Sequence, residues 1–451
     1  MNIIIVGSGS VGAAICKELV KGKHNVTVID TSSQAIAELT NSCDVTGLVG
    51  NGADIAILRE AGAESADILI ATTLHDEINM LCCYAAKKLG TDHTVARVRN
   101  PEYSSFMELM KDDMALSLTV NPEFAVAKQL QRMLKFPAAT TVDSFCHGKV
   151  EIAEFAITPS SPLCNLSIYD LRTKFNIKFL VCGVERNGEA FIPSGKFVIE
   201  AGDNICVTAS DEELVKFFKV AASNSKPVKR ILIMGGGRTT YYLADLLGKN
   251  LSKTTIIEKD IERCRDLSGT YNIDVTHGDG TRQELLLEEG IEKADAFLAL
   301  SDLDEENAIV SMYAKNLGVP RIITMIRSLS YIDFFSDVGL ESIVSPKFST
   351  VDYIMRFVRS LDGTKDSEIE SFHKMMDGKI EAAEFKIKEK IEGLTDIPLF
   401  ELKRKKNFLL ACIVRKNDII IPNGADMLLE GDRAIVLTAG KKLNNVKDIL
   451  A

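Results

Sequence analysis

The stretch MNIIIVGSGSVGAAICKEL (1–19) combines a short apolar run, a glycine cluster and a helical pattern. Gly7, Gly9 and Gly12 form the pattern GxGxxG between a predicted strand and a predicted helix. In such a loop the first glycine allows a tight turn, the second lets a pyrophosphate approach the backbone, and the third lets helix and strand pack closely. The helix N-terminus adds free N–H groups and the positive end of its dipole. The stretch therefore predicts a Rossmann-like phosphate-binding loop made of Gly7, Ser8, Gly9, Ser10, Val11 and Gly12.

An acidic residue follows at the expected distance from this loop. Asp30 ends the second predicted strand, NVTVID (25–30), eighteen residues after Gly12. An acid at this place bonds the ribose hydroxyls of a dinucleotide, and it favours NAD over NADP because it repels a 2′-phosphate. The first part of the chain therefore predicts a site for a dinucleotide or an adenine nucleotide.

The opening pattern occurs a second time, as KRILIMGGGRTTYYLADLL (229–247). A shift of 228 residues aligns about a hundred positions without a gap; it places Asp30 on Glu258 and Arg99 on Arg327. Register kept over this length indicates a duplicated unit.

The second glycine loop departs from the pattern. Thr240 stands where the third glycine is expected, and we expect its bulk to push the helix away and narrow the phosphate site. Arg238 is either an added phosphate ligand or a surface residue. Whether this half binds a nucleotide is left open, with candidate residues Gly235, Gly237, Arg238 and Glu258.

Apolar runs of four to six residues alternate with helical patterns in each copy, which is typical of a parallel sheet covered on both faces. Each copy is followed by a smaller pattern of strands around a short helix: GKVEIAEFAI (148–157), NLSIYDLRTKF (165–175) and FLVCGVERNG (179–188) in the first half, and GKIEAAEFKI (378–387), LTDIPLFELKRK (394–405) and FLLACIVRKND (408–418) in the second. Residues 100–135 read as helical, and 221–230 read as a linker. The predicted fold class is α/β: two Rossmann-like domains with parallel, doubly wound sheets, each followed by a small α+β domain. The predicted boundaries are 1–136, 137–222, 229–365 and 366–451.

Loops at the carboxyl ends of the other strands point to the same ligand in this fold. They place Asn51 and Gly52 near the adenine, with Ala53 as a further candidate, and three residues near the phosphates or second ribose. The alternative for the two threonines among them is that they cap the following helix. The first set is Asn51, Gly52 and Ala53, and the second is Thr72, Thr73 and Asn79.

Two arginines alternate on the fifth predicted strand, HTVARVR (93–99). Arg97 and Arg99 are candidates for bidentate phosphate contacts. The alternative is a surface ion pair; Arg327, which repeats Arg99, favours the functional interpretation.

Composition limits the classes of function. The 451 residues carry 53 basic and 63 acidic side chains, a net charge of −10, which argues against nucleic-acid partners and against direct adsorption to an anionic membrane. We expect neither a secretion signal nor a membrane-spanning run. Ten cysteines without metal-ligand spacing indicate a reduced, cytoplasmic protein.

Features expected of a catalyst are missing from the sequence pattern. A dehydrogenase needs a proton donor or acceptor beside the nicotinamide. His75 is closest to the predicted cleft, but its counterpart in the second copy is Leu303. We therefore expect no catalytic residue and no metal site, with ligand binding itself as the output.

Several stretches together carry a family resemblance: the first glycine loop with Asp30, GNGAD (50–54), ARVRNPEY (96–103), and the endings IPSGKFVIEAGDNICV (192–207) and IPNGADMLLEGDRAIV (421–436). The chain resembles the TrkA family of potassium-uptake regulatory subunits, which carry tandem RCK (KTN) domains in the order RCK-N, RCK-C, RCK-N, RCK-C. The resemblance covers essentially the whole chain.

The resemblance implies a cytoplasmic homotetramer whose domains form a gating ring at the inner face of the membrane, through an integral potassium channel or transporter subunit of the TrkH type. It implies NAD(H) and ATP or ADP as competing ligands at Gly7, Gly9, Gly12 and Asp30. In related domains an arginine after the glycine loop holds a neighbouring domain's phosphate. This chain has Ser10 there in the first copy and Arg238 in the second.

Three functional hypotheses remain open from the sequence. The leading one is a non-catalytic nucleotide sensor that controls potassium uptake. The rival is an NAD-dependent oxidoreductase with a degenerate second half. The third is a sensor for a different transporter.

Overall fold

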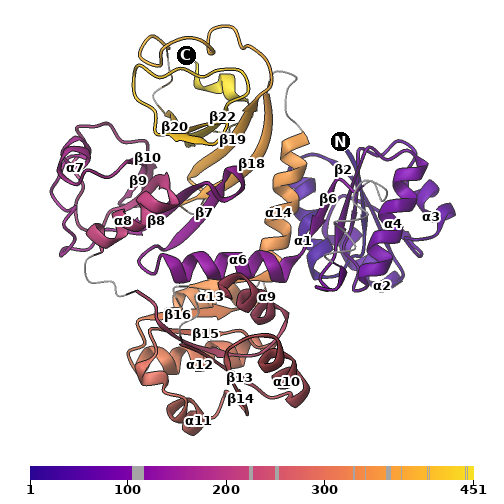
Figure 1. Cartoon of the computed structure of the whole chain (residues 1–451). Coiled ribbons are helices and arrows are strands. Elements are labelled where there is room, and N and C mark those ends of the chain that lie inside the picture. Colours follow the sequence, from indigo (N-terminus) through magenta and orange to yellow (C-terminus); the bar gives the residue numbers. More distant parts are fainter. Residues whose placement is uncertain are drawn as a thin grey trace. The chain divides into compact units, whose positions relative to one another are not determined.

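The computed structural model describes residues 1–103, 116–222, 227–248, 253–328, 331–340, 342–361, 367–376, 378–403, 405, 407–441, 443 and 445–450 (Figure 1). It divides into two compact units. One consists of residues 1–128, 232–292 and 297–355, and the other of residues 129–231, 293–296 and 356–451. The first unit holds both Rossmann-like sheets, and the second holds both small sheets.

The first Rossmann sheet has six strands in the order β3-β2-β1-β4-β5-β6, and every neighbouring pair is parallel. Its strands are β1 (Asn2–Val6), β2 (Asn25–Asp30), β3 (Thr46–Val49), β4 (Ile68–Ala71), β5 (His93–Arg97) and β6 (Leu118–Val120). Its helices are α1 (Ser10–Lys21), α2 (Ser33–Ser42), α3 (Ile55–Glu60) and α4 (Asp76–Leu89). The order reverses between β1 and β4, and ligands of such sheets bind outside the carboxyl ends at this point.

The second Rossmann sheet repeats the order as β14-β13-β12-β15-β16-β17. Its strands are β12 (Arg230–Met234), β13 (Lys253–Glu258), β14 (Asp274–His277), β15 (Ala296–Ala299), β16 (Arg321–Met325) and β17 (Ile343–Val344). Its helices are α9 (Arg238–Leu247), α10 (Ile261–Thr270), α11 (Gln283–Glu288), α12 (Asp304–Asn316) and α13 (Ile332–Asp337), with the 3₁₀ turn η3 (Ile291–Lys293). The apolar runs explain the arrangement, because all four residues of β4 and all four of β15 are buried, as strands covered on both faces require.

The prediction of continuous helix over 100–135 is wrong at residues 118–120. These form β6, which pairs with β5 so that Ala96 lies opposite Thr119. The β-branched residues Thr119 and Val120 favour a strand over a helix. Residues 104–115 of the predicted helix lie outside the described residues. A helix from each half then leads into the small domain: α6 (Pro122–Lys135) in the first and α14 (Pro346–Leu361) in the second.

Each small domain is built on a five-stranded sheet, with the corresponding strand orders β7-β8-β11-β9-β10 and β18-β19-β22-β20-β21. The first sheet consists of β7 (Thr141–Phe145), β8 (Val150–Ala156), β9 (Phe179–Arg186), β10 (Glu189–Phe191) and β11 (Asn204–Ser210); α7 (Ile168–Lys174), α8 (Asp211–Ala221) and the 3₁₀ turn η1 (Cys146–Gly148) accompany it. The second consists of β18 (Ser367–Met375), β19 (Ile380–Ile387), β20 (Phe408–Arg415), β21 (Asp418–Ile420) and β22 (Arg433–Ala439), with the 3₁₀ turn η5 (Val446–Ile449). The strand pairings within both sheets are antiparallel, so the predicted fold class is confirmed.

The predicted helix in LTDIPLFELKRK (394–405) is wrong over the described residues of this stretch, which form turns and isolated bridges instead. In the first small domain Ser167 caps α7, and its hydroxyl accepts a hydrogen bond from the Asp170 N–H. Pro398 occupies the corresponding place in the second, so no side chain is available to cap a helix there.

Glu151 on β8 is a buried acid beside Arg132 of α6, with 3.9 Å between the carboxylate oxygen and the guanidinium nitrogen. Burial raises the pKa of Glu151 from 4.5 to about 7, and Arg132 only partly offsets this. Because the pKa of Glu151 is higher in the folded chain than in the unfolded chain, this side chain contributes its full share of stability only at pH values below the unfolded-state pKa. That contribution is lost as the pH rises through about 7.

We therefore expect Glu151→Gln to stabilise the chain by up to about 2 kcal/mol at pH 8 and by progressively less toward pH 5. Urea unfolding at several pH values measures this difference. An equal effect at pH 5.5 and pH 8 would contradict the burial of an ionised carboxylate.

Candidate functional site

The first glycine loop has the geometry that its sequence predicts. Gly7 has φ +99°, and its N–H donates to the Ile29 carbonyl at 2.9 Å. A Cβ added at Gly12 would lie 1.9 Å from the Gly7 carbonyl oxygen, so only glycine fits this backbone. A Cβ at Gly9 would meet no heavy atom of the described residues within 4 Å. Gly9, followed by Ser10 and Val11 at the start of α1, therefore presents open space where a phosphate would approach.

Asp30 holds this loop from the end of β2. One carboxylate oxygen accepts the Ser8 N–H at 2.7 Å and the Ser8 hydroxyl at 2.8 Å, and the other accepts the Ser32 N–H at 2.9 Å. Burial opposes ionisation, but these hydrogen bonds lower the pKa of Asp30 overall. The carboxylate is charged at neutral pH, remains partly exposed and can accept further hydrogen bonds.

Asp30→Ala is expected to weaken NADH binding by about tenfold or more, because it removes the charged acceptors for the ribose hydroxyls. It also releases Ser8, so the matched control is Ser8→Ala, which keeps Asp30 and loses only the hydroxyl contact. Fluorescence titration with NADH compares the two variants. Equal affinity losses in both would show that Asp30 acts only by holding the loop.

The residues after β3 contribute structure to the first site. The Asn51 side-chain oxygen accepts the Ala53 N–H at 3.0 Å. A Cβ on Gly52 would lie 2.2 Å from a methyl group of Val6 and 3.2 Å from the Cys82 sulfur. Gly52 is therefore required by packing against β1, and the turn that it forms stands beside the carboxyl end of that strand.

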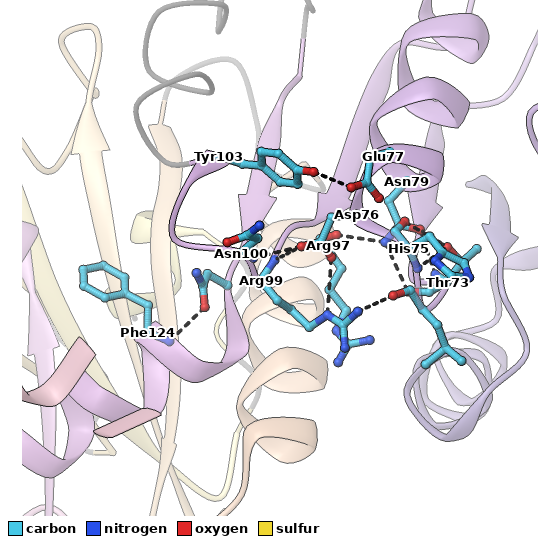
Figure 2. Close-up of polar contacts among 12 residues, drawn as sticks. Thr73, His75, Asp76, Glu77, Asn79, Arg97, Arg99, Asn100, Tyr103 and Phe124 are labelled. Carbon is cyan, nitrogen blue, oxygen red and sulfur yellow. Dashed lines mark hydrogen bonds and ion pairs between the residues drawn. The ribbon is translucent and has the colours of Figure 1, made fainter. Parts of the chain in front are cut away.

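Asn79 is fully buried and ties together the ends of β4 and β5 (Figure 2). Its side-chain oxygen accepts the Thr73 N–H at 2.8 Å and the Thr73 hydroxyl at 2.7 Å. Its amide nitrogen donates to the carbonyls of Thr73, at 3.2 Å, and Arg97, at 2.8 Å. These four bonds use the groups that a ligand contact would need, so Asn79 supports the site from below.

Thr72 and Thr73 do not cap α4, but make hydrogen bonds from the turn that precedes it. The N-cap of α4 is His75, which makes no side-chain cap bond. The Thr72 hydroxyl lies 3.4 Å from the Val6 carbonyl and 3.3 Å from the Gly7 carbonyl, and that of Thr73 accepts the His75 N–H at 3.3 Å. Both threonines brace the turn between β4 and α4, facing the glycine loop.

Arg99 is an ion-pair residue in this structure (Figure 2). Its Nε lies 3.3 Å from Asp76, its backbone N–H donates to the same carboxylate at 2.8 Å, and its guanidinium also donates to the Leu74 carbonyl. The Asn100 N–H completes the set on Asp76 at 2.9 Å. Asp76 was not singled out from the sequence, although its counterpart Asp304 keeps the same role by accepting the N–H groups of Arg327 and Ser328 at 2.8 and 2.7 Å.

Arg97 is the less satisfied of the two arginines. Its Nε is buried with no hydrogen-bond partner among the described residues. Burial, followed by repulsion from Arg99 and with a smaller contribution from Arg238, lowers its pKa, while Glu123 opposes the shift. Arg99 and Arg238 both lie within electrostatic reach of Arg97, and such a concentration of positive charge suits an anion.

The helix that carries Arg238 contacts the first Rossmann domain directly. The Tyr242 hydroxyl donates to the Arg99 carbonyl at 3.2 Å and accepts the Asn121 amide at 2.8 Å. The ring of Tyr242 also packs edge-on to Phe124, with 5.3 Å between the ring centroids. The middle of α9 thereby lies beside the residues that follow β5 and β6. No sequence motif pointed to Tyr242 as a contact residue.

The second glycine loop repeats the support of the first. Glu258 accepts the Gly236 N–H at 2.5 Å and the Asp260 N–H at 2.8 Å. The Thr240 hydroxyl donates to the Gly235 carbonyl at 2.6 Å, so the larger side chain is accommodated by a hydrogen bond.

A cavity of ≈ 380 Å³ lies at this switch point, so the second site is open; that Thr240 narrows its phosphate end stays a prediction. Gly235, Gly237 and Glu258 line it, whereas Arg238 is not among its lining residues. Other lining residues missed by sequence reasoning are Lys259, Arg263 and Thr281. Lys259 directly follows the acid Glu258, which is the only signal that pointed to it.

These features define a class: paired Rossmann-like domains with glycine loops at their switch points, each joined to a small antiparallel domain. The TrkA-N domain model matches residues 3–118 and 231–346, and the TrkA-C domain model matches residues 152–222. A Trk system potassium uptake protein TrkA homolog of Archaeoglobus fulgidus is 30% identical over 450 residues, with all of both chains covered. The TrkA homolog 1 of Methanosarcina mazei is 32% identical over 99% of each chain. The chain belongs to the TrkA family, as predicted.

Solved structures confirm the fold independently. The GsuK RCK domain superposes with a TM-score of 0.63 at 17% identity, over 97% of this chain and 92% of that chain. The GsuK channel bound to NAD gives the same TM-score and identity, over 97% of this chain and 77% of that chain. In the described part of the chain, no helix is long and apolar enough to cross a bilayer, and no three His, Cys, Asp or Glu residues are grouped to hold a metal ion.

Proposed function

We propose that the chain is the nucleotide-sensing regulatory subunit of a potassium uptake system, and that NAD(H) and ATP or ADP compete for its first Rossmann domain. The observation that carries the proposal is the first glycine loop, where Gly9 opens onto free space directly above the N-terminus of α1. Relatives named Trk system potassium uptake protein, which match over the full chain, support the transport role.

The ligand proposal rests on the loop, its acid and the neighbouring arginines. A pyrophosphate at Gly9 would meet the free N–H groups of α1, while the ribose would reach Asp30. Arg97 and Arg238 would supply positive charge on the side of the phosphates, so the second domain would contribute to the first site. The structures of the GsuK channel bound to NAD and of GsuK bound to ADP, with TM-scores of 0.63 and 0.51, support the choice of these two ligand classes.

We propose no catalytic step. Asp30, Ser8 and Thr72 hold the first loop through hydrogen bonds, which supports a binding role for them. His75, at the N-cap of α4, has Leu303 as its counterpart in the second copy. The oxidoreductase alternative makes a separate prediction, the steady consumption of NADH in the presence of a carbonyl substrate.

We propose that copies of the chain assemble through α4 and α12, as a homotetramer. Leu81 and Tyr84 on α4 are 53% and 41% exposed, and their counterparts Ile309 and Met312 on α12 are 67% and 39% exposed. Large apolar side chains repeated at one face of both copies fit an interface with another copy of the chain.

Leu81→Lys combined with Ile309→Lys is expected to shift the chain from a tetramer to a smaller species, because lysine ammonium groups are costly to bury. Light scattering coupled to size exclusion measures the mass. The control places lysine at Val49, which is also exposed but lies outside α4 and α12. An unchanged mass of the double variant would contradict the assembly proposal.

The membrane partner is proposed to be an integral potassium channel or transporter subunit of the TrkH type, which would hold this chain at the inner face of the membrane. The test is potassium flux into vesicles that contain such a subunit, with and without this chain. Flux that responds to NADH and ATP only when the chain is present supports the proposal. Nucleotide binding without any effect on flux would favour a sensor for a different transporter.

A further inference from the structure

The two small domains pair through surfaces that correspond to each other. The Cys146 N–H donates to a Glu384 carboxylate oxygen at 2.8 Å, and the Met376 N–H donates to a Glu154 oxygen at 2.9 Å. Cys146 and Met376 both adopt left-handed backbone conformations, with φ of 52° and 50°. Each domain thus donates a backbone N–H to a glutamate of the other domain, from corresponding positions. Such an exchange is typical of a two-fold, isologous interface.

Strand register confirms which positions correspond. Asp143 lies opposite Ile152 in the pair β7–β8, and His373 lies opposite Ala382 in the pair β18–β19. Each residue of the second pair is 230 positions after its counterpart in the first, so Asp143 and His373 are themselves counterparts. Apolar residues of both sheets form one cluster at this surface, with Phe145 and Cys146 from one side and Met375 and Met376 from the other.

Asp143 and His373 are counterparts that touch each other. The carboxylate oxygen lies 2.6 Å from the His373 Nδ1. In a two-fold pairing, a residue meets its own counterpart only at the axis, so this pair marks the axis of the interface. The two sides are chemically different there, whereas the Cys146–Glu384 and Met376–Glu154 bonds are symmetric.

The contact with Arg356 determines which ring nitrogen of His373 carries the hydrogen. Arg356 Nη1 lies 2.8 Å from Nε2, and a guanidinium can only donate, so Nε2 accepts. Nδ1 therefore carries the hydrogen and donates it to Asp143. Burial disfavours the charge on Asp143, but His373, Arg356 and Arg132 hold its pKa below the ordinary value. The axis thus joins one donor to one charged acceptor.

Pairing of like domains would lose this match. Two first domains would bring Asp143 against Asp143, which places two carboxylates in one buried site. Two second domains would bring His373 against His373; with Arg356 on each Nε2, both rings would present a donating Nδ1. The bonds from Glu154 and Glu384 reach backbone N–H groups, and they would survive in every combination.

We propose that the Asp143–His373 pair determines which small domains pair, selecting a first domain with a second domain and disfavouring like-with-like pairing between chains. The surface is an interface whose occupant is the other small domain of the same chain. The Asp143–His373 pair supplies the selectivity for unlike domains. The Glu154 and Glu384 carboxylates cannot supply it, because they accept backbone N–H groups that both small domains present.

The test exchanges the two residues in the full-length chain. Asp143→His creates a histidine pair and His373→Asp creates a carboxylate pair, while the double exchange recreates one donor and one acceptor in reverse. Arg132 is ten residues into α6, as Arg356 is ten residues into α14. Arg132 is therefore placed to serve the imidazole that the double exchange puts on β7, as Arg356 serves His373.

Pairing is read by a crosslink inside the chain. The Lys149 ammonium lies 2.8 Å from the Asn417 side-chain oxygen across the interface, so Lys149→Cys and Asn417→Cys with a short bis-maleimide report on first-with-second pairing. The chain without these two cysteines gives the background from the ten native thiols. Thermal unfolding is followed in parallel.

Each single exchange is expected to reduce the internal crosslink several-fold and to lower the melting temperature by about 5 °C. The double exchange is expected to restore both toward the starting values. The control Glu185→Gln removes the off-axis ion pair with Lys379, and it should keep the crosslink. A double exchange no better than the single ones, or single exchanges that keep the full crosslink, would overturn the proposal.

Discussion

Gly9→Val is expected to weaken NADH binding by about 100-fold or more while leaving the chain folded. Gly9 has φ −60° and ψ −177°, an extended conformation that valine readily adopts. Its added side chain would enter the open space above the loop, which a pyrophosphate must otherwise fill. A 100-fold loss corresponds to about 2.7 kcal/mol of binding free energy.

The duplicated chain provides the control for this variant. Gly237 is the counterpart of Gly9, with φ −73° and ψ −175° and the same open surroundings among the described residues. Gly237→Val is expected to leave most of the NADH affinity of the first site intact, because Gly9 and Asp30 are unchanged and Gly237 has a backbone conformation that valine adopts. Circular dichroism and melting temperature establish that both variants fold. Normal NADH affinity in a folded Gly9→Val chain would remove the first loop as the site.

Asn79→Ala is expected to destabilise the first Rossmann domain by about 3 kcal/mol and to weaken nucleotide binding as well. The substitution leaves buried groups of Thr73 and Arg97 without the partner they have now, and such groups cost about 1–3 kcal/mol each before relaxation. The loops that carry these two residues would then lose their fixed separation. Urea unfolding and NADH titration measure the two effects.

Asn307→Ala is the matched control for that variant. Asn307 is equally buried, accepts the Ser301 N–H at 3.0 Å and donates to the carbonyls of Ser301 and Met325 at 3.0 and 2.9 Å. We expect a similar loss of stability in the second domain with little change in NADH affinity. An equal affinity loss in both variants would show that Asn79 acts through general destabilisation.

The sequence allowed most of the fold to be predicted, because its evidence is repeated. Continuous apolar strands followed by helices predicted two parallel sheets, and a duplicated register excluded coincidence. β6 escaped prediction because three residues carry no periodicity, and its strand character depends on pairing with β5. The described residues of the corresponding stretch in the second small domain form no helix, and Pro398 stands there in the place of the capping Ser167, a difference of one position that the overall pattern does not reveal.

The sequence singled out several residues that the structure brings together at the candidate site, but it did not predict which groups each of them contacts. The glycines and Asp30 could be singled out because their spacing is typical of a dinucleotide loop, and the structure joins them in one turn; their contact with a nucleotide stays a prediction. Asn79 and Arg99 were assigned to a ligand, whereas the structure engages them with protein groups; such choices depend on which neighbours the fold supplies. The hydrogen bond from the Thr240 hydroxyl to the Gly235 carbonyl could not be predicted from side-chain size.

The most direct test is a fluorescence titration of the full-length chain with NADH, with ATP and ADP as competitors and the absorbance of NADH followed in the same sample. We predict saturable binding that adenine nucleotides displace, strong loss of that binding in Gly9→Val, and constant NADH over hours. Steady oxidation of NADH, or binding unaffected by Gly9→Val, would contradict a non-catalytic sensor whose ligand lies on the first glycine loop.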